Sequence, residues 1–123
     1  MRRLALIVLA GLAGCSTAPN PSRLVEGGQR YEFTSSRAPK LLAECTAVNA
    51  RSFSSRYTSS VGEMIRPDNF QVIVSELRTF DYDPIIVART APAAGGSQLV
   101  VFTDGAMGEP RTSDWIARLR KDC

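Results

Sequence analysis

Three cysteines and a complete lack of histidine define the chemistry open to this chain of 123 residues. Without an imidazole, the chain cannot build a Ser-His-Asp or Cys-His nucleophile, and it lacks the commonest catalytic metal ligand. We therefore predict no catalytic residue, no metal site and no cofactor, and we expect the chain not to be an enzyme. The chemistry that remains belongs to Cys15, Cys45 and Cys123.

Cys15 follows a short basic and apolar segment at the amino end of the chain. Arg2 and Arg3 precede an apolar run from Leu4 to Leu12, and small residues then lead into the cysteine. The run is shorter than the roughly 20 residues that a membrane-spanning helix needs. With Leu12-Ala13-Gly14-Cys15 as its lipobox, the segment resembles the signal peptide of bacterial lipoproteins.

This resemblance implies that residues 1–14 are a signal peptide and that cleavage falls before Cys15, whose thiol then takes a diacylglycerol. Acylation of the new amine would complete a firm anchor, because two lipid signals already suffice for stable attachment to a membrane. In this family an Asp after the cysteine commonly retains the protein at the inner membrane, and this chain has Ser16 there. The resemblance therefore implies an outer-membrane protein that faces the periplasm.

The chain after the cleavage site divides into a tether and one domain. Residues 15–22 are expected to be a lipidated tether, because Ser16–Ser22 holds small residues and two prolines. Residues 23–123 are long enough for a single domain with a modest core. Once Arg2 and Arg3 are removed, 13 basic residues face 12 acidic ones. This near neutrality argues against nucleic acid as a partner.

The first part of the domain is predicted to be a strand followed by a helix. Alternation over Arg30–Thr34 indicates a strand with Tyr31 and Phe33 on one face. A helix is expected over residues 38–53, with Pro39 near its first position. Apolar side chains at helical spacing form its expected buried stripe: Ala38, Leu41, Leu42, Cys45, Val48 and Phe53.

Four strands and a last helix are predicted after this. The strands are expected over Tyr57–Ile65, Phe70–Leu77, Ile85–Thr90 and Leu99–Thr103, with turns between them. The last helix is expected to begin at a cap on Thr112 or Ser113. Its apolar face is expected to hold Trp115, Ile116, Leu119 and Cys123.

The resulting order is β-α-β-β-β-β-α, which predicts an α+β fold with a two-layer architecture. Consecutive strands with short turns indicate an antiparallel meander, against which the two helices pack. The order of a helix and a four-strand meander is similar to that of cystatin-like and nuclear-transport-factor-like sheets, which wrap around a helix. Similarity of element order alone carries no function.

Cys45 and Cys123 are expected to form a disulfide. They are an even pair once Cys15 carries lipid, and the periplasm is oxidising. Each stands on the apolar face of a predicted helix, and two helices side by side on one sheet would bring the two thiols together.

Continuous apolar runs in three predicted strands are the candidate binding surface. In a meander with one solvent-exposed face, apolar and polar residues should alternate along each strand, whereas these runs are apolar throughout. Either the sheet covers its second face with the amino-terminal segment and loops, or that face meets a partner, a second copy of the chain or an apolar ligand. The partner-binding candidates are Val72, Val74, Ile86, Val100 and Phe102. If these residues belong to the core, the binding surface is expected in the loops around Asp81–Asp83 and Gly105–Pro110 instead.

Three further patterns are better explained by structure than by chemistry. Asp81 and Asp83 have the spacing of a cation-binding pair, but a solvated turn between strands is favoured. Gly95–Ser97 is expected to be a hairpin loop rather than an anion cradle. Asn49 is expected to bond main-chain groups near it.

These observations predict a lipid-anchored module of the cell envelope that binds a protein or cell-wall partner and catalyses nothing. The alternative is a small enzyme or an apolar-ligand carrier that uses the interior of the sheet. A buried carboxylate at the mouth of a deep cavity would favour the alternative. If the second face of the sheet is open, two copies of the chain can also pair through it as a homodimer.

Overall fold

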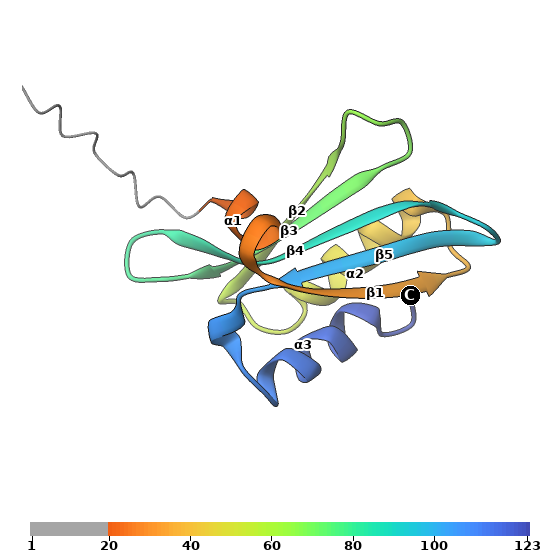
Figure 1. The fold of residues 1–123 in the computed structure, drawn as a ribbon. Coiled ribbons are helices and arrows are strands. Elements are labelled where there is room, and N and C mark those ends of the chain that lie inside the picture. Colours follow the sequence, from red (N-terminus) through yellow and green to blue (C-terminus); the bar gives the residue numbers. More distant parts are fainter. Residues whose placement is uncertain (1–19) are drawn as a thin grey trace, which may run out of the picture.

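The computed structural model describes residues 20–123 of the chain. These residues form a five-stranded antiparallel sheet with helices on both faces (Figure 1). In chain order the elements are α1 (Pro21–Gly27), β1 (Gln29–Ser35), α2 (Pro39–Arg51), β2 (Tyr57–Glu63), β3 (Phe70–Leu77), β4 (Tyr82–Ala93), β5 (Gly96–Thr103), the 3-10 helix η1 (Gly105–Met107) and α3 (Arg111–Arg120). The strand order is β1-β5-β4-β3-β2. Strands β2 to β5 form the predicted meander, and β1 is added beside β5.

The predicted α+β class with an antiparallel sheet is confirmed, while the chain order contains one helix more than expected. That helix is α1, which precedes β1 and includes the last two residues of the expected tether, Pro21 and Ser22. The tether prediction is therefore wrong for these two residues. Cys15 and the rest of the lipobox lie outside the described residues.

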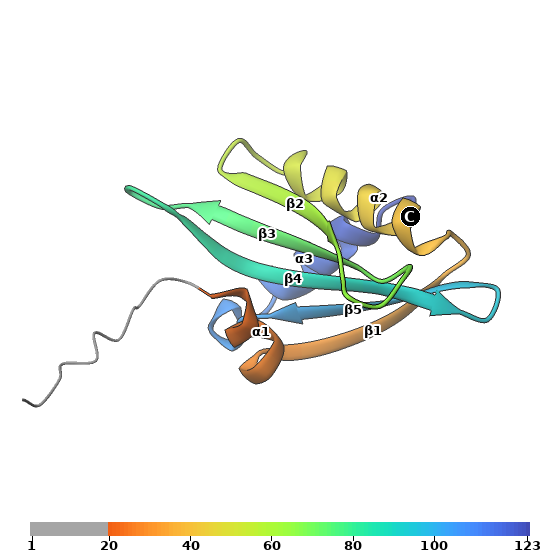
Figure 2. The same ribbon diagram turned by 90° about the horizontal axis from the view of Figure 1, so that it is seen from above.

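The main core lies between one face of the sheet and helices α2 and α3, which pack side by side (Figure 2). Alternate residues of the central strands point into it, among them Val72 and Val74 of β3 and Ile86 of β4. From α3, Trp115 and Leu119 are buried there, as predicted. Because both helices cover the same face, their exposed sides form one outer surface of the molecule.

The buried face of α2 differs from the predicted one. Leu41 and Val48 are 55% and 53% exposed, although the predicted stripe placed both inside. The buried residues of the helix are mostly small: Leu42, Ala43, Thr46, Ala47 and Ala50. Small side chains let the helix backbone lie close to the sheet, so the larger Leu41 and Val48 turn toward solvent.

An aromatic cluster closes the core at the end of α2. The ring of Trp115 stacks on that of Phe53 with centroids 4.5 Å apart, and Tyr57 meets Trp115 edge-on at 4.7 Å. Offset and edge-to-face arrangements of this kind are the favoured geometries for aromatic pairs. The cluster therefore ties α3 to the segment that joins α2 and β2.

The expected cap of α3 is also corrected. The residue before its first turn is Pro110, which makes no side-chain cap. Thr112 is buried inside the helix, and its hydroxyl donates to the Gly108 carbonyl at 2.8 Å. Thr112 therefore ties the helix to the loop before it from within the first turn.

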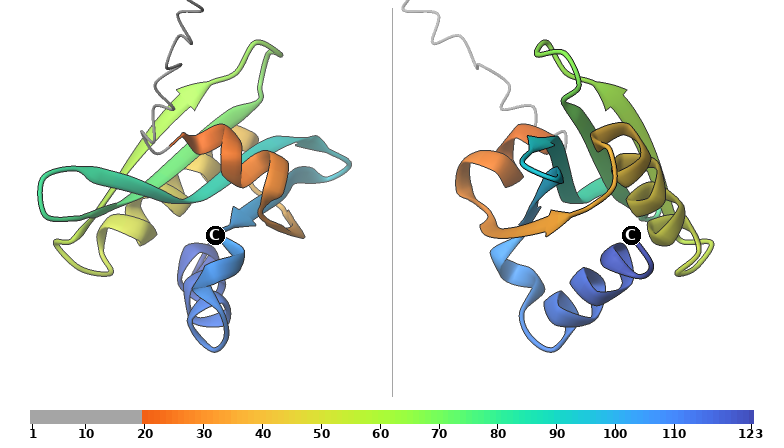
Figure 3. Two further views of the ribbon diagram at one scale, coloured as in Figure 1. Left: turned by 60° about the vertical axis from the view of Figure 1, so that its left-hand side comes forward. Right: turned by 90° about the vertical axis from the view of Figure 1, so that its right-hand side faces the viewer.

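Helix α1 lies on the opposite face of the sheet from α2 (Figure 3). Its start follows a known pattern, because Pro21 occupies the first turn and the Asn20 side chain accepts from the Ser22 amide at 3.0 Å. Leu24 is buried against Val87 and Phe102 in a second, smaller core. This small helix therefore buries apolar side chains that the sheet would otherwise expose.

Candidate functional site

Cys45 and Cys123 are joined by a disulfide, with their Cα atoms 5.9 Å apart, as the sequence predicts. The bond links α2 to the residues that follow α3. It lies beside several hydrogen bonds to the carboxyl end of the chain. Ser35 donates through Oγ to the Cys123 carbonyl at 2.8 Å, and Arg37 donates to the Asp122 carbonyl at 2.7 Å. The disulfide and these hydrogen bonds therefore hold the carboxyl-terminal residues against the rest of the domain.

Three of the five partner-binding candidates are core residues. Val72, Val74 and Ile86 are fully buried beneath α2 and α3, so in this structure no partner can reach them. These three residues belong to the continuous apolar runs of the strands. The runs have a different cause, because neighbouring residues of one strand point into two cores on opposite faces.

The other two candidates, Val100 and Phe102, lie on the second face of the sheet. Phe102 is buried against Leu24 of α1, and Val100 packs beside it. The guanidinium groups of Arg30 and Arg89 each lie 5.9 Å from the centre of the Phe102 ring. The amino-terminal segment therefore covers this end of the second face, which is the first of the two explanations weighed for the runs.

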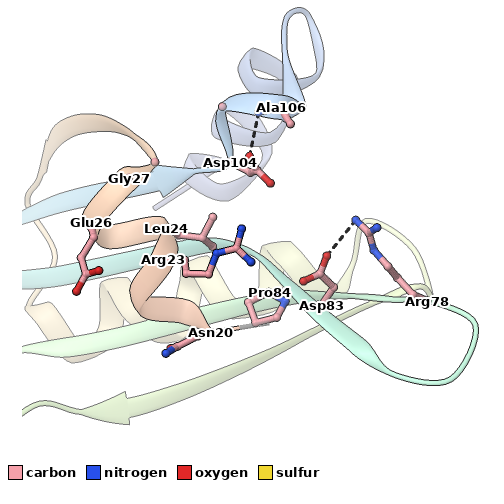
Figure 4. Close-up of a pocket in the computed structure, with 12 residues that line it drawn as sticks. Asn20, Arg23, Leu24, Glu26, Gly27, Arg78, Asp83, Pro84, Asp104 and Ala106 are labelled. Carbon is pink, nitrogen blue, oxygen red and sulfur yellow. Dashed lines mark hydrogen bonds and ion pairs between the residues drawn. The ribbon is translucent and has the colours of Figure 1, made fainter. Parts of the chain in front are cut away.

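A polar hollow of about 680 Å³ opens where α1 meets two loops of the sheet (Figure 4). It takes in parts of both loops that remained as candidate surfaces, namely Asp83 and the residues Gly105 and Ala106. Helix α1 supplies one wall, the β3–β4 hairpin a second, and the segment from Asp104 to η1 a third. The residues that line it are Asn20, Arg23, Leu24, Glu26, Gly27, Gly28, Arg78, Asp83, Pro84, Asp104, Gly105 and Ala106.

Charges of both signs line this hollow. The Arg78 guanidinium pairs with the Asp83 carboxylate at 3.0 Å across the hairpin. The Asp104 carboxylate accepts from the Ala106 amide at 2.9 Å and so caps η1. From α1, the Arg23 guanidinium points into the hollow, whereas the Glu26 carboxylate points away from it (Figure 4). Such a surface suits a polar ligand that itself carries both charges, since each sign finds its complement.

The β3–β4 hairpin ends in an apolar hairpin tip, which consists of Leu77, Phe80 and Tyr82. All three side chains are exposed, and Phe80 is 98% accessible to solvent. Leu77 and Tyr82 face one another across the two strands. Figure 1 shows this hairpin projecting beyond the rest of the sheet, beside α1.

The remaining patterns have the structural explanations that the sequence favours. Asp81 accepts from the Tyr82 amide at 2.7 Å, while Asp83 pairs with Arg78, so both carboxylates serve the hairpin. Gly95 has a φ of 77° in the β4–β5 turn, where L side chains are disfavoured. Asn49 bonds main-chain carbonyls, but those of Leu119 in α3 and of Lys121 just after it rather than those of its own helix.

Within residues 20–123, no three His, Cys, Asp or Glu side chains come together as a metal site. In the same range, no helix combines the length and apolar character needed to cross a membrane. Comparison with protein-family models, curated proteins and solved structures finds no match to this chain. Its function is therefore inferred from its own residues.

The sequence alone points to two of the three walls of the hollow but not to the hollow itself. The loops around Asp83 and Gly105 are candidate binding surfaces in the sequence. The residues of α1, by contrast, are predicted to be the end of the tether and the start of the domain, with no helix there. Asn20 followed by Pro21 is a helix-start pattern that could have revealed the third wall.

Proposed function

We propose that this protein is a lipid-anchored module of the bacterial cell envelope that binds a protein or cell-wall partner and catalyses no reaction. In this proposal Cys15 carries the lipid and the domain faces the periplasm from the outer membrane. The lipobox Leu12-Ala13-Gly14-Cys15 supports the anchor. The observation that carries the binding role is the mixed-charge hollow beside the point where the described chain begins.

The carboxylates of the hollow support binding rather than acid–base chemistry. Asp83 is held by Arg78, and Asp104 is held by a main-chain amide. A general acid or base must be free to exchange a proton with substrate, whereas these groups are already engaged in shaping two loops. The interior of the sheet, which an enzyme or carrier would use, is filled by Val72, Val74 and Ile86.

The proposal is tested with the full chain, expressed in a bacterium that processes lipoproteins. The Cys15→Ser variant should leave the membrane fraction and accumulate as unprocessed precursor or soluble protein, because no thiol remains to be lipidated. Mass spectrometry of the wild-type amino terminus should find lipid on Cys15. Wild-type protein that is soluble in the periplasm, with an unmodified Cys15, would refute the anchor.

The binding role is tested in the same membranes by chemical cross-linking and mass spectrometry. Arg23→Glu reverses a charge in the hollow, and Lys40→Glu makes the same change on α2, on the other face of the sheet. Partners cross-linked to the wild type and to Lys40→Glu should be lost from Arg23→Glu. If all three proteins capture the same partners in equal amounts, the hollow is not the binding site.

A further inference from the structure

The apolar hairpin tip lies at the end of the molecule where the described chain begins. Asn20 and Arg78 line the same hollow, so the start of α1 and the start of the hairpin turn lie on one recess of the molecule (Figure 4). Asn20 is the fifth residue after Cys15, so five residue steps connect the two. At no more than about 3.6 Å per residue, this segment can span at most about 18 Å.

We propose that the apolar hairpin tip docks into the lipid surface that holds the Cys15 anchor, an inference that rests on the proposed function. A domain held within about 18 Å of its lipidated residue must present one end to the bilayer. The short connection brings the start of α1, and with it the hairpin, to that end. Phe80 and Tyr82 then enter the interfacial layer of headgroups, where amphipathic and aromatic side chains are favoured.

The side chains and the backbone of the tip suit such a contact. Phe80 is almost fully exposed in the isolated domain, so its burial in lipid removes a large apolar surface from water. The hairpin is already ordered, because the Arg78 amide donates to the Asp81 carbonyl at 2.7 Å and the Arg78 side chain pairs with Asp83. A tip that is already ordered loses little conformational freedom when it docks.

Exposure alone does not select the tip, because Ile65 in the β2–β3 loop is also fully exposed, at 104%. Strand β3 runs between the two loops and has eight residues, so about 25 Å separates its ends. Figure 1 shows the β2–β3 loop projecting from a different part of the sheet. Ile65 therefore provides a matched control that differs in position but not in exposure.

The test uses the lipidated full chain, reconstituted into vesicles of three parts phosphatidylethanolamine to one part phosphatidylglycerol. Phe80→Trp and Ile65→Trp each place a fluorescent ring in one loop, and lipids brominated near the headgroup quench rings that enter the interface. Wild-type protein gives the background from Trp115, which is buried in the core. Thermal melts of the three proteins should agree, since both substituted side chains are exposed.

We expect severalfold stronger quenching, and a blue-shifted emission, for Phe80→Trp than for Ile65→Trp. Equal quenching of the two variants on vesicles that carry the protein would overturn the docking inference and leave the anchor standing. Protein that does not float with the vesicles would overturn both, because the inference depends on the anchor. Quenching at Ile65→Trp alone would show that the opposite end of β3 faces the membrane.

Discussion

Asn49 shows how one polar side chain at the edge of a buried face can hold two helices together. Its Nδ2 group donates to the carbonyls of Leu119 and Lys121 at 3.1 and 2.9 Å. These carbonyls stand at the end of α3, where a helix leaves its last acceptors without partners inside the helix. Asn49 therefore caps α3 from α2, next to the disulfide that joins the same two regions.

The sequence predicts main-chain bonding for Asn49 but not its partners. Side chains of this type often bond backbone within a few residues, and the local option was the natural expectation. The actual acceptors are about 70 residues away in the chain. They become neighbours only through the packing of α3 on α2, a long-range event that a local pattern does not encode.

Replacing Asn49 by alanine should lower the free energy of unfolding by about 1 kcal/mol, because the part-buried Leu119 carbonyl and the exposed Lys121 carbonyl lose their donor. Asn49→Asp should be destabilising as well, since a carboxylate cannot donate to these carbonyls. Urea unfolding with the disulfide intact measures both effects. Glu44→Ala, at an exposed position of α2, is the control and should change stability by less than about 0.5 kcal/mol. An Asn49→Ala protein as stable as this control would contradict the capping role.

At the scale of elements, the strands were predicted best. Phe70–Leu77 has the predicted bounds, and the strands on either side begin at or before their predicted starts. Period-two patterning and turn residues are local signals that survive folding. The predicted disulfide between Cys45 and Cys123 is confirmed because it needed only two helices on one face of the sheet.

Helix α1 is absent from the prediction, and the buried face of α2 is predicted only in part, because Leu42 is buried as expected whereas Leu41 and Val48 are exposed. Prolines and small residues in the first segment favour a tether, and only tertiary contacts of Leu24 make a seven-residue helix stable there. In α2, hydrophobicity alone favours Leu41 and Val48 for the core. Close packing on the sheet instead selects Ala43, Ala47 and Ala50, a steric preference that does not appear in a hydrophobic pattern.

Gly28 joins the end of α1 to the start of β1, and it lies close to the backbone of both α1 and β5. Its neighbour Gly27 has free space around it, so the two glycines can be compared by the same substitution. A Cβ at Gly28 would lie 2.4 Å from the Leu24 carbonyl oxygen and 2.6 Å from that of Thr103, both main-chain atoms. Gly28→Ala must therefore displace α1 from β5 and uncover Phe102. Gly27→Ala meets no atom within 4 Å and serves as the control.

We expect Gly28→Ala to destabilise the domain by about 1–3 kcal/mol, the range typical of overpacking. Gly27→Ala should be neutral or mildly stabilising, because alanine favours the helical state over glycine. Thermal unfolding gives the stability, and hydrogen exchange at β5 amides reports whether α1 still covers the strand. Equal behaviour of the two variants would mean that α1 does not depend on close approach at Gly28.

At the scale of the whole molecule, the sheet separates two environments. One face carries the main core under α2 and α3, and the other is covered by α1 at one end only. Near the β2–β3 loop the second face stays half-open, with Gln71, Ile73 and Arg89 lining a shallow depression there. The apolar runs in the sequence thus combine side chains of two cores and a partly exposed surface.

Adjacent residues of β3 test this division. Val72→Asp places an unpaired carboxylate in the main core, which costs several kcal/mol and should unfold the domain. Ile73→Asp places the same charge on the half-open face, near the guanidinium of Arg89, where water and that cation reduce the cost. Circular dichroism melts should show a folded Ile73→Asp protein with a moderate loss of stability and an unfolded Val72→Asp protein. If Ile73→Asp also unfolds, the second face at Ile73 is part of the core rather than half-open.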